Sequence, residues 1–157
     1  MKTTAISIMM TIVLVFGLSI STQAVLIDRG RGMIYSTELN VTWLQDVNYA
    51  QTSGYDADGL MTWGEAMAWA ANLSYGGYSD WRLPTYDPAS PQQSCSATKL
   101  HEMAYLLYVE LNNCSGQYLY NYGPFINVLP PGDYDGIRWS STEYDPSNAY
   151  YLYFQCG

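Results

Sequence analysis

"LMTWGEAMAWAANLSYGGYSDWRLPT" (residues 60–85) joins a helical pattern to a glycine pair and an Asp-Trp-Arg motif. Thr62 and Glu65 have the spacing of a capping box, in which the two side chains satisfy free backbone N–H groups at a helix start. Apolar residues follow at helical spacing, at Trp63, Ala66, Met67, Ala70 and Leu73. We therefore predict an amphipathic helix over about 62–74, ended by Gly76 and Gly77.

Before this stretch, residues 25–46 alternate short β-prone segments with turn residues. Gly30 and Gly32 supply the first turn and Asn40 closes the second, so the pattern predicts a small antiparallel meander. Residues 47–59 are polar and glycine-bearing, which is typical of a surface loop.

After it, apolar residues repeat at i, i+3, i+4, i+7, i+8 and i+11 from Leu100 to Leu111, and this spacing predicts a second helix over about 97–111. Two β-prone segments, 137–144 and 149–155, close the chain. The sequence thus predicts an α+β fold in which two helices pack on a small, mainly antiparallel twisted sheet with long irregular loops.

The first residues resemble an export signal. Lys2 precedes an apolar run that ends in small residues near Ala24, so we expect residues 1–24 to be a cleaved signal peptide and 25–157 to be one domain. The protein would then be secreted, extracellular or periplasmic, with no membrane attachment after signal removal. Three cysteines, Cys95, Cys114 and Cys156, suit an oxidising compartment, and their pairing stays open.

The expected mature chain is strongly acidic. Without Lys2, fourteen Asp and Glu residues face five Lys and Arg residues, a charge of about −9. Repulsion between like charges excludes nucleic acid as a partner and disfavours sulfated polymers.

The sequence lacks the motifs of the common hydrolases. His101 is the one histidine, and the second histidine of an H-E-x-x-H zinc motif is replaced by Tyr105. No G-x-S-x-G nucleophile elbow is present. We therefore expect no catalytic residue, no metal centre and no enzyme, and we interpret His101 as a surface or partly buried polar residue.

Two acidic turns resemble halves of a calcium loop. Asp56 and Asp58 precede Gly59, and Asp133 and Asp135 precede Gly136, but neither segment supplies the later acidic ligand. Asx turns explain both segments without a metal. The prediction is therefore no cofactor, with calcium as the alternative.

Tyrosines gather in the segment between the second helix and the last strands, at Tyr118, Tyr120 and Tyr122. Aromatic side chains in long loops often bind ligands, and tyrosine can stack on sugar rings. The alternative is that these rings cover the irregular part of a small domain. With Asp133 and Asp135, they are the candidate binding residues.

The stretch 60–85, the Leu-rich helix and "GIRWSSTEY" (136–144) together resemble the C-terminal domain family named after the Lcl collagen-like adhesin, in the form seen in exported bacterial proteins with a sorting tail. "GMIYSTELNVTWLQD" (32–46) resembles the opening strands of that family. The resemblance implies a C-type-lectin-like fold and a role in adhesion or glycan binding. Six residues carry over as a fold signature only: Asp80, Trp81, Arg82, Trp139, Ser140 and Ser141.

We expect this signature to be internal scaffolding, in which Arg82 needs a carboxylate or carbonyl partner. The family continues past "NAYYLYFQCG" with further strands, so a closing strand is expected to be missing here. The predicted function is a non-enzymatic binding or adhesion module whose partner is a glycan or another surface protein. The alternatives are a structural or vestigial domain without a ligand and, less favoured, an enzyme on a scaffold related to the formylglycine-generating one.

Overall fold

The computed structural model of the chain describes residues 25–90, 97–113, 119–128, 136–146 and 148–153. The predicted signal peptide, the three cysteines, Tyr118, Asp133 and Asp135 lie outside these residues. No helix in the described ranges is long and apolar enough to cross a bilayer.

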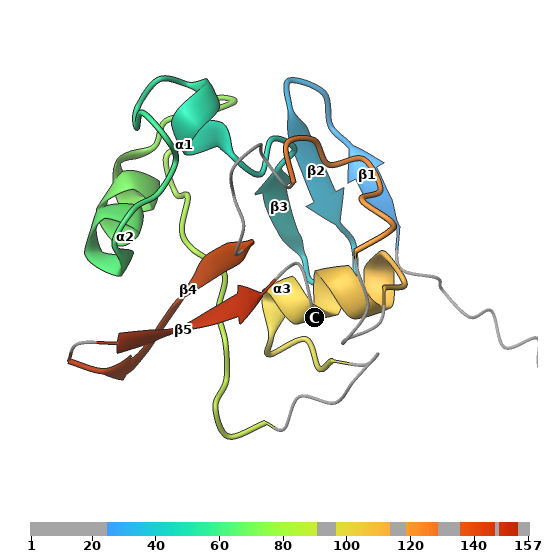
Figure 1. The fold of residues 1–157 in the computed structure, drawn as a ribbon. Coiled ribbons are helices and arrows are strands. Elements are labelled where there is room, and N and C mark those ends of the chain that lie inside the picture. The colour runs from blue at the N-terminus through green and yellow to red at the C-terminus, as the bar shows by residue number, and fades with distance from the viewer. Residues whose placement is uncertain (1–24, 91–96, 114–118, 129–135, 147, 154–157) are drawn as a thin grey trace, which may run out of the picture.

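The N-terminal strands form the predicted meander (Figure 1). Strands β1 (Leu26–Asp28), β2 (Met33–Ser36) and β3 (Val41–Leu44) pair antiparallel in the order β1-β2-β3. Gly30 and Gly32 have positive φ in the first turn, and Asn40 has positive φ at the second, as the turn chemistry predicts. Ile34, at the centre of β2, is fully buried.

The region predicted to be a loop, 47–59, contains the short helix α1 (Tyr49–Thr52), so that prediction was wrong for these four residues. The carboxylate of Asp46 explains the turn. It accepts hydrogen bonds from the backbone N–H of Asn48 at 2.9 Å and from the hydroxyl of Thr52 at 2.6 Å. A side chain that bonds to both ends of a turn stabilises that turn. Apolar periodicity does not report such a bond, so the sequence pattern missed the helix.

Helix α2 (Trp63–Asn72) confirms the first predicted helix. Thr62 and Glu65 form the capping box: the N–H of Thr62 donates to the Glu65 carboxylate at 2.8 Å, and the N–H of Glu65 donates to the Thr62 hydroxyl at 3.4 Å. The prediction that the glycine pair ends this helix was wrong, because the backbone of Leu73 is already extended.

Gly76 and Gly77 instead form a two-residue turn between Tyr75 and Tyr78, which exchange backbone hydrogen bonds of 3.0 Å in both directions. Both glycines have positive φ, the geometry of a type I′ hairpin turn. A Cβ at Gly76 would lie 2.5 Å from the sulfur of Met33, so the turn also requires a small residue there.

The second predicted helix is shorter than expected. It consists of α3 (Glu102–Tyr105), continued by a π-helical turn, η1 (Leu106–Glu110), in which the N–H of Leu111 donates to the carbonyl of Leu106 at 2.9 Å. The helix begins after His101, whose backbone is not helical and whose imidazole contacts the N–H of Asp87 and the carbonyl of Ser90. Leu100, predicted to lie on the apolar face, is 54% exposed.

The last strands, β4 (Ile137–Asp145) and β5 (Asn148–Tyr153), confirm the two predicted β-segments, and the structure shows that they pair antiparallel. They form a sheet of their own, apart from β1, β2 and β3, so the single sheet predicted from the sequence is wrong. The fold is a small α+β arrangement with two small antiparallel sheets, and Figure 1 shows the α3 helix beside both.

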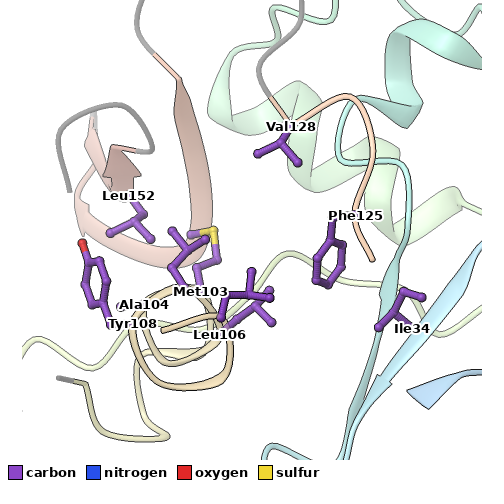
Figure 2. Packing of buried hydrophobic residues seen from close by; sticks show 10 residues of the cluster. Ile34, Met103, Ala104, Leu106, Tyr108, Phe125, Val128 and Leu152 are labelled. Atoms are coloured by element: carbon purple, nitrogen blue, oxygen red, sulfur yellow. The ribbon is translucent and has the colours of Figure 1, made fainter. Parts of the chain in front are cut away.

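The core joins these parts. Ile34 from β2, the buried face of α3 and η1, Phe125 and Val128 from the segment after the helix, and Leu152 from β5 form one cluster of buried residues (Figure 2). Because each element contributes only a few side chains, the core depends on the α3–η1 helix to connect the two sheets.

Candidate functional site

The Asp-Trp-Arg motif lies beside the start of α3, where Arg82 forms an ion pair with Glu102. Two guanidinium nitrogens of Arg82 donate to the two carboxylate oxygens of Glu102 at 2.8 and 2.7 Å, and the N–H of Thr85 donates to Glu102 Oε2 at 2.7 Å. The Glu102 side chain is 11% exposed, whereas that of Arg82 is 50% exposed. Arg82 was expected to need a carboxylate or carbonyl partner, and it has both, the Glu102 carboxylate and the carbonyl of Leu83. Glu102 is a residue that sequence reasoning missed.

The charged state of this pair is stabilised by its own hydrogen bonds. Burial raises the pKa of Glu102, but the hydrogen bonds from Arg82 and Thr85 and the positive charge of Arg82 outweigh it, so its pKa lies below the ordinary value. The hydrogen bond to Glu102 in turn raises the pKa of Arg82. The pair is therefore ionised at neutral pH and fixes the Arg82 side chain.

The residues after Arg82 connect α3 to β4. The carbonyl of Pro84 accepts from the N–H of Ser141 at 2.7 Å, and Tyr86 exchanges backbone bonds with the Thr142 hydroxyl at 3.0 and 2.6 Å. His101 was predicted to be at least partly exposed, but it is only 1% exposed. Its Nε2 lies 2.7 Å from the carbonyl oxygen of Ser90. Its imidazole is a packing and hydrogen-bonding group of this connection.

The second half of the signature holds α2 against β4. The indole N–H of Trp139 donates to the carbonyl of Met61 at 3.0 Å, and the indole N–H of Trp63 donates to the carbonyl of Ser140 at 2.8 Å. The Ser140 side chain is buried and donates to the carbonyl of Tyr150 at 2.9 Å. These residues act as structural ties between α2 and the β4–β5 sheet.

A polar hollow of about 300 Å³ opens beside the Asp-Trp-Arg motif. The type I′ turn and a hydrogen bond of 3.3 Å from the indole N–H of Trp81 to the carbonyl of Tyr75 position its wall. Its lining residues are Asn40, Val41, Thr42, Trp43, Tyr78, Asp80, Trp81, Arg82, Pro84 and Glu102. Aromatic rings therefore lie beside charged and amide side chains, a combination suited to binding small polar molecules.

An apolar cavity of about 550 Å³ adjoins the polar hollow. It lies between α2, β3, α3–η1 and β4, and Trp69, Leu106 and Phe125 are among the apolar side chains that line it. Figure 2 shows Met103 and Leu106 from the helix together with Phe125 and Val128 from the segment that follows it. Both volumes fall within the range of small-molecule sites.

The expectation that the Asp-Trp-Arg motif is wholly internal is wrong. Asp80 is exposed, Trp81 is partly buried, and Arg82 lines both the polar hollow and the apolar cavity. Backbone groups of Pro84 and Tyr86 make the hydrogen bonds to β4. The side chains of Asp80 and Arg82, which precede them, lie at the surface. The motif therefore combines a structural role with a surface that a ligand can reach.

The tyrosine loop, Leu119–Gly123, lies at the other end of the helix. The side chain of Asn113, 2% exposed, accepts from the N–H groups of Tyr120 and Asn121 at 3.3 and 3.1 Å and donates to the carbonyl of Asn121 at 2.9 Å. Tyr120 is 60% exposed and Tyr122 39% exposed. Tyr122 lines the apolar cavity, so the structure brings only this tyrosine of the described loop to a cavity wall.

The described acidic turn has the geometry of Asx turns. Asp56 Oδ1 accepts from the N–H groups of Asp58 at 3.1 Å and Gly59 at 2.7 Å, and these hydrogen bonds, that from Gly59 foremost, lower the pKa of Asp56. In the described part of the chain, no group of three His, Cys, Asp or Glu side chains is placed to hold a metal ion.

Comparisons of the chain with protein-family models, with curated proteins and with solved structures find no match.

Sequence reasoning passed over two residues that line the polar hollow, Trp43 and Tyr78. Trp43 lies on β3, and Tyr78 follows the glycine turn. Their sequence signal was weak, because neither lies in a motif with chemical meaning.

Proposed function

We propose that the protein is a non-enzymatic, secreted or surface-associated binding module with a C-type-lectin-like fold, and that it binds a glycan in the polar hollow. The resemblance to the Lcl C-terminal domain family motivates the class. The observation that supports the site is the Arg82–Glu102 pair beside Trp81, which holds charged hydrogen-bonding groups next to an aromatic ring.

Sugars have polar hydroxyls around an apolar ring face, so their sites need both kinds of group. Trp81 and the 52% exposed ring of Tyr78 offer aromatic surface, while Asn40 and Asp80 offer amide and carboxylate groups. Arg82 uses three N–H bonds on Glu102 and Leu83 among the described residues, which leaves two of its five donors for a ligand.

The net charge of −8 selects among glycans, since it repels sulfated and other polyanionic chains. A neutral or cationic glycan is therefore the favoured ligand. Export of the chain, with a cleaved signal over residues 1–24, is part of this proposal.

A glycan array probed with the purified protein, with and without calcium, tests the proposal. Tyr78→Ala and Asp80→Asn should each weaken binding of the best neutral glycan at least fivefold. Tyr120→Ala is the matched control, because Tyr120 is similarly exposed (60%) but lies outside the polar hollow.

Loss of binding in Tyr120→Ala with none in Tyr78→Ala would move the site to the tyrosine loop. An array with no glycan above background would favour a structural domain without a ligand of its own. Calcium dependence would point to an acidic site outside the polar hollow.

A further inference from the structure

The polar hollow and the apolar cavity share one wall. Five residues line both: Thr42, Trp43, Trp81, Arg82 and Pro84. Trp81 and Arg82 therefore stand at the boundary between a charged compartment and an apolar one. The two compartments therefore adjoin along these five residues.

The apolar cavity is partly open to solvent and has a volume of about 550 Å³. Leu60 lines it and is 70% exposed, which indicates that this part of the wall faces solvent. Apolar groups of a ligand would gain free energy by displacing water from its aromatic and aliphatic walls.

From these observations, and resting on the proposed glycan site, we infer that the protein binds an amphipathic glycoside. The sugar head occupies the polar hollow and the apolar aglycone extends past Trp43 and Trp81 into the apolar cavity. Each methylene that enters the cavity should tighten binding about fourfold, the factor that burial of one methylene gives.

The test is calorimetric titration with methyl, butyl and hexyl β-glycosides of glucose, galactose, mannose and N-acetylglucosamine, below their micelle concentrations. For at least one sugar, affinity should rise steeply from methyl to hexyl. The Leu60→Glu variant places a charge in the wall of the apolar cavity and should abolish the affinity gain of the hexyl over the methyl glycoside.

Leu100→Glu is the matched control, because Leu100 is also exposed (54%) and lines neither compartment. Both exposed positions tolerate a charge, and equal melting temperatures would verify this. A hexyl tetraethylene glycol ether serves as a probe without a sugar.

The outcomes separate the two proposals. Equal affinity for methyl and hexyl glycosides would overturn the amphipathic site and keep the glycan site. Equal affinity for the hexyl glycosides and the sugar-free ether would overturn the composite site, because the head would then contribute nothing. No binding of any glycoside would overturn both.

Discussion

At the N-terminal end of the α3–η1 helix, Glu102 bonds to Arg82 and Thr85, which precede it by 20 and 17 positions. At the C-terminal end, Asn113 bonds to Leu107, Tyr120 and Asn121, between six and eight positions away. The first end is held by charge and by distant segments, and the second is held by neutral, local hydrogen bonds.

The difference bears on where a binding site forms. The distant partners of Glu102 hold the segment 82–85 against α3, and this segment and Glu102 line the polar hollow together with residues of β3 and Tyr78. The local partners of Asn113 shape one loop and add little from elsewhere in the chain. The proposed site therefore depends on an arginine with a distant partner and not on the aromatic-rich loop.

The largest expected effect comes from breaking the charged end. Glu102→Gln replaces one acceptor oxygen by an amide that faces the Arg82 and Thr85 donors. Because Arg82 is half exposed, we expect a loss of about 2 to 3 kcal/mol in unfolding free energy rather than the full cost of breaking a buried pair. Urea denaturation monitored by tryptophan fluorescence measures it.

Glu38→Gln is the control for this variant, since Glu38 pairs with Lys99 at 2.6 Å and Lys99 is 52% exposed. Its loss of unfolding free energy should be clearly smaller, because solvent screens an exposed pair. Equal losses of unfolding free energy in the two variants would show that the Arg82–Glu102 pair stabilises the fold no more than an exposed pair does.

Breaking the neutral end should have a smaller and more local effect. Asn113→Ala leaves the N–H groups of Tyr120 and Asn121 without their acceptor and should cost about 1 to 2 kcal/mol. Hydrogen exchange should speed up in the tyrosine loop, while glycan affinity stays at the wild-type value. Asn72→Ala, at an exposed asparagine on α2, is the matched control. If glycan binding weakened in Asn113→Ala but not in Asn72→Ala, the tyrosine loop would contribute to glycan binding, contrary to the proposal.

The smallest expected effect is a difference between Glu102 and Glu110 in how their carboxylates make stability depend on pH. Burial raises the pKa of Glu110, whose Oε1 accepts from Ser36 at 2.6 Å while Oε2 has no partner among the described residues. A raised folded pKa stabilises the fold at low pH, and this contribution is lost as the pH rises through the folded pKa. Glu102, with a lowered pKa, contributes stability that is lost as the pH falls below about 4.5, its ordinary value.

Glu110→Gln should therefore raise the melting temperature at pH 7, and the gain should vanish below about pH 4.5, the ordinary value of this group. Thermal unfolding from pH 3 to 8 tests this, with Glu102→Gln expected to show the opposite trend, its deficit shrinking as the pH falls. A gain from Glu110→Gln that persisted at pH 3 would contradict a role of the buried charge.

Local chemistry was predictable from the sequence, and long-range partners were not. The Thr62–Glu65 capping box and the β-meander depend on residues a few positions apart, and both were predicted. Arg82 was predicted to need a carboxylate or carbonyl partner, but the identity of Glu102 depends on how the chain returns to α3. The start of that helix was misplaced because the imidazole of His101 bonds to Ser90, a tertiary contact that helical spacing does not encode.

The π-helical turn of η1 has a consequence for changes in chain length. A helix that closes one turn with an i→i+5 bond holds one residue more than regular α-helix would, and such turns are understood as single-residue insertions. Removing the exposed Val109 would return the turn to α-helix while Glu102 and Asn113 keep facing their partners. A one-residue deletion, usually severe within a core helix, would here be tolerated better than many substitutions.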